Sequence, residues 1–268
     1  MVDEAPTRGK AQESIKEASQ VLHWRFSTKS PKKPLYDYLQ ADKDNELANS
    51  SPLLNSIALL PASRISLRPL LELLSGFEMD LLFSAEDQEF PIDTEKDLEI
   101  YAHRVASTVA AGLLELVFSH SKVQYSNIQR ERIINAGQKM GQALQYVNIA
   151  RDIKRDATIN RVYIPSMWLK TKGLTPTDVI QRPEDPTLAT FESQMLVKAD
   201  NAYRSNLSAI DQLPKDVRGP IKTTVESYMM IGQMVRKARQ DGIKVDGKLK
   251  VSLWRRLKLA WWEMYMNQ

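Results

Sequence analysis

One long segment, from about Asn127 to Asp156, has helical periodicity and carries amide and carboxylate side chains along one face. Residues four apart on an α-helix are rotated by only about 40° from each other, so Asn148, Asp152 and Asp156 form a stripe about 12 Å long. Gln145 lies one turn before that stripe. Together with other long helical segments and only 10 glycines in 268 residues, this segment favours an all-α fold over a sheet protein.

The two carboxylates of the stripe lie one turn apart and repel each other. That repulsion costs a few tenths of a kcal/mol, about 0.2–0.5, in an isolated helix and more where both groups are buried. A hard cation would offset the repulsion, and Mg²⁺ is commonly held by one or two carboxylates together with substrate phosphates. The alternative is that Asp152 and Asp156 are solvated and pair with neighbouring basic residues of the same helix. The pattern therefore indicates either a metal-diphosphate site or an ordinary charged surface.

Composition excludes several other kinds of site. The chain has no cysteine, which removes disulfides, thiolate metal sites and a cysteine nucleophile, and its 3 histidines argue against a histidine-rich metal centre. No continuous apolar run reaches about 18 residues, so no membrane-spanning helix is expected, and the N-terminus does not resemble a signal peptide. We expect an intracellular protein that is cytoplasmic or peripheral to a membrane.

The net charge of +4 is compatible with nucleic acid, an anionic membrane surface or an anionic substrate. No zinc-finger spacing or RNA-binding signature accompanies it, so no nucleic-acid partner is expected. Basic and aromatic residues alternate near the C-terminus, where Trp254, Trp261 and Trp262 follow several lysines and arginines. Such a segment is either a helix at a membrane interface or a last helix packed into the core, and the sequence favours neither.

Periodicity and capping signals predict the main helices, and no linker divides the chain, so residues 1–268 are expected to form a single domain. The segment 27–55 is expected to be a flexible loop, and a proline-rich connection contains Pro176, Pro183 and Pro186. The predicted helices cover residues 7–26, 66–83, 94–120, 127–156, 188–211, 217–240 and 249–266.

Small side chains are concentrated in the first half of the 94–120 segment. They let another group approach the helix backbone closely, either a neighbouring helix that packs tightly or a ligand in a tunnel. These small residues are Ala102, Ala106, Ser107, Ala110, Ala111 and Gly112.

The acidic stripe continues into Asn160–Pro165, and the whole block resembles the second aspartate-rich motif of the squalene and phytoene synthases, the head-to-head prenyl transferases. Residues 76–81, 101–109 and 228–232 are similar to further blocks of that family. Within the family, the chain most resembles the phytoene synthase domains of fungi. Those domains often follow a membrane-embedded lycopene cyclase, which this sequence does not contain.

The resemblance implies an isoprenoid synthase-type helical bundle around a central cavity. It also implies the condensation of two geranylgeranyl diphosphates, through prephytoene diphosphate, to phytoene in carotenoid biosynthesis. By the same resemblance the cofactor is Mg²⁺, with Mn²⁺ as an alternative, and the partners are an isoprenoid diphosphate and a lycopene cyclase. Peripheral membrane association would suit substrates with long isoprenoid tails.

The resemblance also assigns roles to individual residues. The metal ligands are Asp152, Asp156 and Asn148, with Asp3 as the remnant of the first aspartate-rich motif. Tyr101, Arg161 and Tyr163 join the aspartates in catalysis, and Val105 and Val109 face the isoprenoid tail. The diphosphate is bound by Gln145, Asn148, Tyr228, Arg236 and Lys248.

The sequence departs from the family pattern at its beginning. Only Asp3 of the first aspartate-rich motif is present, and the helices that normally precede the motif are absent, so the domain is expected to be incomplete at its N-terminus. Arg155 replaces the usual glutamate before Asp156, and Lys248 replaces an arginine, which loses bidentate phosphate contact.

Three alternatives to phytoene synthesis remain at this point. One is a non-catalytic relative of the fold, like the assembly factors of respiratory complex I, which would be mitochondrial. Another is an inactive fragment. The third is a squalene-type synthase that uses farnesyl diphosphate.

Overall fold

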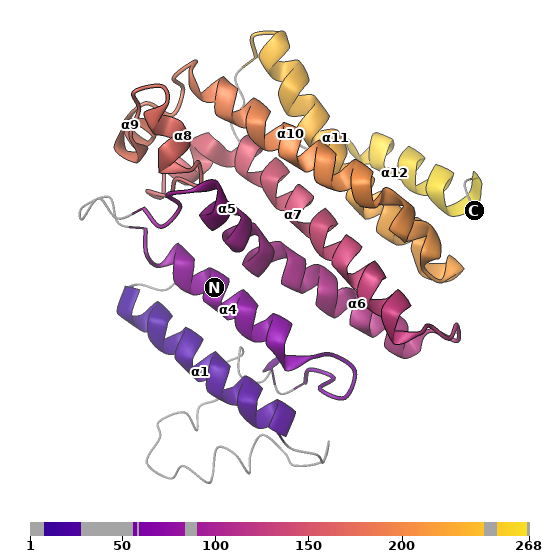
Figure 1. Cartoon of the computed structure of the whole chain (residues 1–268). Helices are drawn as coiled ribbons and strands as arrows, with labels where there is room; N and C mark the ends of the chain where they lie inside the picture. The colour runs from indigo at the N-terminus through magenta and orange to yellow at the C-terminus, as the bar shows by residue number, and fades with distance from the viewer. Residues whose placement is uncertain (1–7, 28–55, 58, 84–89, 244–250, 267–268) are drawn as a thin grey trace.

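The computed structural model describes residues 8–27, 56–57, 59–83, 90–243 and 251–266. These residues contain helices and no strand (Figure 1), which confirms the predicted all-α class. The site predictions at Asp3 and Lys248, and nearly all of the predicted loop 27–55, lie outside the described residues.

The long helix that carries the acidic stripe is α7, Asn127–Ala157, which runs through the middle of the bundle (Figure 1). It packs against α6 (Thr108–His120), α10 (Leu188–Asn206) and α11 (Lys215–Gln240). Ser126 and Gln129 form a capping box that fixes its first turn. Because α7 contacts helices on several sides, its residues point both into the core and into the site described below.

The predicted 94–120 helix is divided in three. A capping box between Thr94 and Asp97 starts α5, Glu95–Ala102, as the sequence indicated. A π-helical segment, η3, covers His103–Ser107 and leads directly into α6. π-Helical turns occur mostly as single-turn insertions in α-helices, frequently at functional sites.

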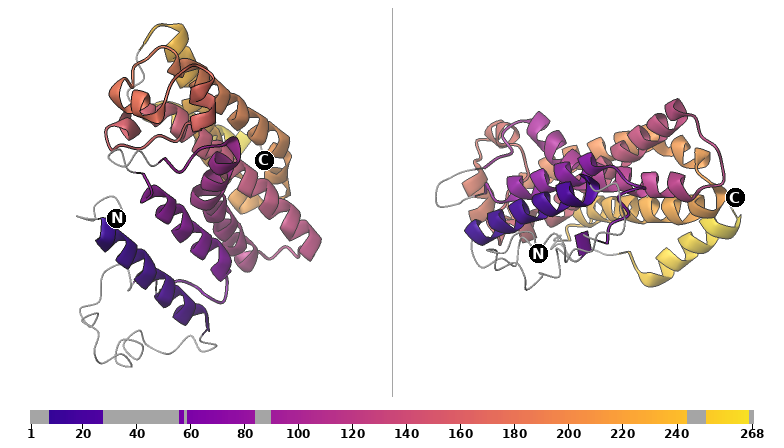
Figure 2. Two further views of the ribbon diagram at one scale, coloured as in Figure 1. Left: turned by 60° about the vertical axis from the view of Figure 1, so that its left-hand side comes forward. Right: turned by 90° about the horizontal axis from the view of Figure 1, so that it is seen from below.

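A smaller layer lies on the outside of the bundle, where α1 (Arg8–Ser27) packs beside α4 (Leu67–Asp80) (Figures 1 and 2). Its apolar cluster is built around Ala18, Val21 and Leu22 and is separate from the main core. Helix α4 in turn contacts η3 and α6, so it joins the outer layer to the rest of the bundle.

The proline-rich connection after α7 contains two short helices that the sequence reading missed, α8 (Ser166–Lys170) and α9 (Pro176–Gln181). Helix α10 continues into a 3₁₀ segment, η4, Leu207–Gln212. After α11 the chain forms α12 (Leu253–Trp261) and a second π-helical segment, η5 (Trp262–Met266). No helix in the described part of the chain is long and apolar enough to cross a bilayer.

Candidate active site

A cavity of about 550 Å³ lies between η3, α6, α7, η4 and α11. Its walls are mostly apolar, and Val105 and Val109, the residues expected to face an isoprenoid tail, are both among them. The wall residues from α7 include Ile133, Gly137, Met140, Gly141 and Leu144, and those from α11 include Pro220, Ile221 and Val225.

The small residues of this region lie both at a close helix contact and at the wall of the cavity. Ala106 and Ala110 line the cavity, and Ala106 and Ser107 also lie against Gly141 of α7. A Cβ atom built on Gly141 would lie 2.8 Å from the backbone oxygen of Ala106. The Ser107 hydroxyl also donates to the backbone oxygen of Gln138, at 2.7 Å. The small side chains therefore permit close helix packing and leave open space on the neighbouring face.

Polar groups are found where the cavity wall reaches the C-terminal parts of α7 and α11. Gln145 and Asn148 are the last cavity residues of α7, and Tyr228 is the last of α11. Asp152 and Asp156 follow Asn148 by one and two turns on the same face of α7. The structure thus places an apolar cavity next to a row of oxygen-bearing side chains.

The first carboxylate of the row already has a cationic partner. Arg151 binds Asp152 with two hydrogen bonds, from Nε to Oδ1 at 2.8 Å and from Nη2 to Oδ2 at 2.5 Å. These bonds raise the pKa of the Arg151 guanidinium above its usual value. This observation matches part of the alternative reading, in which a neighbouring basic residue pairs with the stripe.

The second carboxylate is in a different environment. Burial, followed by the nearby charge of Asp152, raises the pKa of Asp156 to about 7, although Arg161 and Arg155 act in the opposite direction. A carboxylate that is buried beside another carboxylate is unfavourable unless a cation or a proton neutralises it. Asp156 is therefore not an ordinary solvated surface residue.

The residues present fit a divalent cation of the magnesium type. The Oδ1 atom of Asn148 is buried and has no hydrogen-bond partner among the described residues, so it is available as a ligand. With Asp152 and Asp156 it would supply three oxygen ligands, and Mg²⁺ commonly takes the rest from water and substrate phosphates. No group of three or more acidic, histidine or cysteine side chains that could hold a metal occurs in the described ranges.

Sequence reasoning missed one acidic residue at this site, Asp80 at the end of α4. The Tyr163 hydroxyl donates to Asp80 Oδ1 at 2.8 Å, and Arg161 Nη1 lies 3.5 Å from Asp80 Oδ2. Tyr101 stacks on Tyr163 with ring centroids 4.7 Å apart, and burial raises the pKa of both tyrosines. A signal was available, because a carboxylate in the last turn of a helix opposes the helix dipole and requires a compensating partner.

Replacing Asp80 by asparagine is expected to lower turnover about 10-fold to 100-fold, the range typical of residues that orient a site's ligands. Asparagine keeps the shape and can still accept from Tyr163, but it loses the ionic contact with Arg161. Steady-state kinetics of the variant would measure the effect. Asp93→Asn is the matched control, because the Asp93 side chain is 58% exposed and 4.0 Å from its cation, Lys170. Equal turnover in both variants would contradict a role for Asp80.

Arg236 is a further candidate that pairs with a neighbouring helix. Its Nη1 atom lies 2.6 Å from Asp200 Oδ2 on α10. Tyr228 and Gln145 remain at the cavity wall. Direct contact of these three residues with a diphosphate stays a prediction.

Together, the fold and the site define an all-α protein of the isoprenoid synthase type, with an apolar cavity beside an acidic stripe. The squalene/phytoene synthase family model matches residues 2–255, and the chain belongs to that family. Its fold is also that of a crystallised dehydrosqualene synthase, with a TM-score of 0.62 and 21% identity over 97% of this chain and 87% of that one.

Curated relatives in fungi are bifunctional lycopene cyclase/phytoene synthases. The protein from Arthroderma gypseum is 48% identical over 98% of this chain, and that from Gibberella fujikuroi is 41% identical over 97%. The chain spans only 44% of the length of each of these two relatives, so it matches one part of a larger bifunctional protein.

Proposed function

We propose that this chain is a phytoene synthase-type prenyltransferase that joins two geranylgeranyl diphosphates head to head, through prephytoene diphosphate, in carotenoid biosynthesis. The observation that carries the proposal is the position of Asn148 in the wall of a cavity of about 550 Å³, with Asp152 and Asp156 one and two turns further along the same face of α7. An allylic diphosphate has the matching halves, an apolar tail and a compact anionic group. The phytoene synthase names of the fungal relatives support the C20 substrate.

In this proposal Asn148, Asp152 and Asp156 hold Mg²⁺, or Mn²⁺ in its place. When bound, the ion supplies Lewis acidity to the departing diphosphate. Gln145 and Tyr228 orient the diphosphate from the cavity wall. Arg161 has enough donors to contact Asp80 and a phosphate oxygen together, because a guanidinium carries five N–H groups.

The cavity walls have their own part in the proposed reaction. Ionisation of an allylic diphosphate leaves a carbocation that water would quench. Val105, Val109 and Leu144 line the cavity with hydrocarbon, and an apolar enclosure limits the access of water to a reactive intermediate. These residues therefore select the tail and protect the intermediate.

The buried acidic stripe also favours catalysis over a purely structural role. A carboxylate whose pKa is raised to about 7 by burial and by its neighbour is strained when ionised. A purely structural protein gains nothing from two neighbouring buried carboxylates that are unfavourable when ionised. In a metal site, the bound cation would offset that unfavourable free energy. The raised pKa of Asp156 therefore favours an enzyme over the non-catalytic relatives of the fold.

Two partner assignments belong to the same proposal. The lycopene cyclase part named in the fungal relatives would consume a product derived from phytoene, so we place a cyclase near this chain in the cell. The long tails of substrate and product also place the reaction at a membrane surface, with the protein bound peripherally.

The direct test is incubation of the purified chain with geranylgeranyl diphosphate and Mg²⁺, followed by extraction and mass analysis. Phytoene is the expected product. Prephytoene diphosphate alone would show that the first condensation occurs without the second ionisation. A parallel incubation with farnesyl diphosphate distinguishes the squalene-type alternative. If the folded chain makes no product while an intact fungal relative is active beside it, the proposed activity of this chain is wrong.

A further inference from the structure

The C-terminal helix presents an apolar stripe to solvent. In α12 and η5, Leu253 is 66% exposed, Trp254 81% and Tyr265 68%, and Leu257 and Trp261 are about half exposed. The three tryptophans of this segment do not pack into the core, so that alternative from the sequence is wrong. At 100° per residue the five side chains share an arc of about 120°. They therefore form one surface, which we call the C-terminal stripe.

Cations border the stripe on both sides. On the same helical projection, Lys258 and Arg255 follow Trp254 and Tyr265 on one side, and Arg256 lies on the other. All three basic residues are exposed. The acidic residue of the segment, Glu263, faces the protein, where it is 5% exposed and lies 2.8 Å from Lys222 Nζ. The outer surface of the segment is therefore apolar and positively charged.

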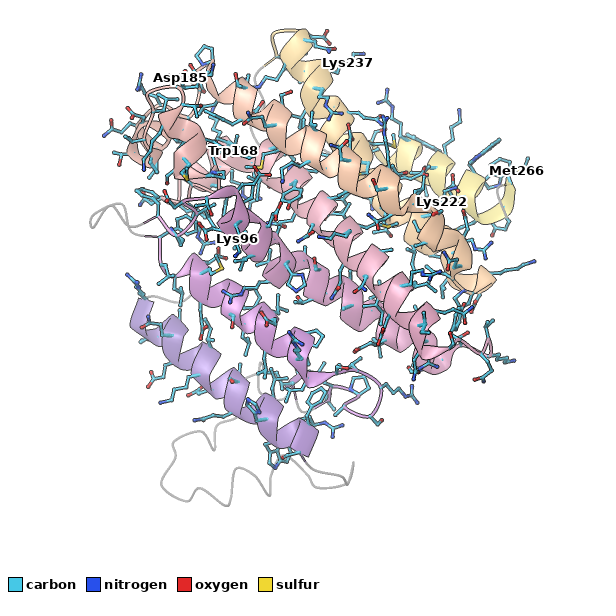
Figure 3. All side chains as sticks on the ribbon, viewed as in Figure 1. Lys96, Trp168, Asp185, Lys222, Lys237 and Met266 are labelled. Atoms are coloured by element: carbon cyan, nitrogen blue, oxygen red, sulfur yellow. The ribbon has the colours of Figure 1, made fainter. Side chains whose placement is uncertain are left out.

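The segment is held firmly on α11, although its outer face is uncovered. A Cβ atom built on Gly219 would lie 3.0 Å from the backbone oxygen of Glu263, so the backbones of α11 and η5 are in close contact. Figure 3 shows Lys222 on α11 and Met266 at the end of η5, at the outer edge of the bundle. Figures 1 and 2 show α12 along that edge. The stripe is thus a fixed surface of the protein.

The same turns of α11 also reach the cavity. Pro220 and Ile221, which line the cavity, are next to Gly219 and Lys222, which hold η5. One short stretch of α11 thus has the cavity on one side and the C-terminal segment on the other. Anything that binds to the C-terminal stripe would therefore lie close to the apolar cavity.

We propose that the C-terminal stripe binds an anionic lipid bilayer and lies in its interface. Exposed tryptophan and leucine with flanking lysine and arginine are the composition of interfacial helices. The bordering cations select for acidic headgroups, and their long side chains reach the headgroups while the stripe is immersed. This proposal concerns a surface outside the active site, and its test needs no substrate.

The test is co-sedimentation of the full chain with vesicles of phosphatidylcholine, with and without about one third phosphatidylserine. The wild-type chain is expected to bind the anionic vesicles and to dissociate as salt is raised. The triple variant Trp254→Ser, Leu257→Ser and Trp261→Ser is expected to lose at least about tenfold in partitioning, because three large apolar side chains no longer enter the bilayer. Ile128→Ser is the matched control, since Ile128 is 70% exposed at the start of α7.

A second variant separates charge from burial and leaves the apolar surface intact. Arg255→Gln with Lys258→Gln is expected to reduce binding to anionic vesicles about fivefold for each charge, and to change binding to neutral vesicles little. Unchanged vesicle binding in both variants would overturn the proposal. If the wild-type chain instead self-associates, ignores vesicles and becomes monomeric in the triple variant, the stripe is an interface between copies and the proposal is also wrong.

Discussion

Replacing Asp156 by asparagine is expected to reduce phytoene formation by about 10²-fold to 10³-fold, the usual loss when one group that stabilises transition-state charge is removed. The amide keeps the volume of the carboxylate but carries no charge for a divalent cation. The effect should fall mainly on turnover, because the apolar cavity that binds the tail is unchanged. Product formation under saturating substrate measures it.

The control for this variant is Asp241→Asn, which removes a carboxylate at the exposed end of α11. It should leave turnover unchanged. Retention of full activity in Asp156→Asn would reject the metal role of the stripe, whatever the activity of other variants.

The same substitution should make the protein more stable at high pH. The pKa of Asp156 is raised from 3.8 to about 7 in the folded chain, so the folded state holds this proton more tightly than the unfolded state does. The contribution of protonated Asp156 to stability is therefore fully present below about pH 4 and is lost as the pH rises through 7. A shift of about three pKa units corresponds to a few kcal/mol, about 4 at most.

Urea unfolding at pH 5 and pH 8 without divalent cations would measure this difference. The Asp156→Asn variant has no titrating group at this position. Its free energy of unfolding should therefore exceed that of the wild-type chain by more at pH 8 than at pH 5. Subtracting the free energy of unfolding of the wild-type chain from that of the variant removes the contributions of the other acidic groups. An equal difference at the two pH values would contradict the raised pKa.

Replacing Gly141 by alanine is expected to destabilise the fold by about 1–3 kcal/mol, because the added methyl group has no space. It would meet the backbone of Ala106 at 2.8 Å and the Cα atom of Ser107 at 3.1 Å. Backbone atoms of η3 cannot rotate away as a flexible side chain can. The two helices must separate, and the cavity that they share must change with them.

Gly112 provides a matched comparison in the neighbouring helix α6. No heavy atom lies within 4 Å of a Cβ atom built there. Gly112→Ala should therefore stabilise the protein by about 0.5–1 kcal/mol, through the better helix propensity of alanine alone. Unfolding free energies of the two variants should thus move in opposite directions, and equal changes would show that helix contact at Gly141 does not matter.

Helix bounds were predictable where local chemistry determines them. The capping box at Thr94 and the periodicity of the 127–156 segment use residues a few positions apart, and both elements were placed nearly correctly. The short helices α8 and α9 were missed because their few residues cannot show a clear period. The π-helical turn η3 depends on its packing against α7, which no local pattern records.

The same distinction between local and tertiary contacts applies to the candidate site. Asn148, Asp152 and Asp156 share one helix, so spacing alone brought them together. Asp80 joins Tyr163 from 83 positions earlier in the chain, and only tertiary structure makes that contact. The pairing of Arg236 with Asp200 is likewise a contact between two helices. The sequence could indicate the neighbouring basic partner of Asp152 but not the partners that come from other helices.

The two hydrogen bonds from Arg151 to Asp152 give the acidic stripe an internal counter-ion. At the proposed metal site, Asp152 would therefore have to exchange its guanidinium partner for a divalent cation, because the carboxylate is already paired. The affinity of Asp152 for the ion would then be the difference between two electrostatic interactions, and the Arg151 guanidinium would be free to bind the anion that accompanies the metal. Uptake of cation and anion would be coupled, so that neither binds well without the other.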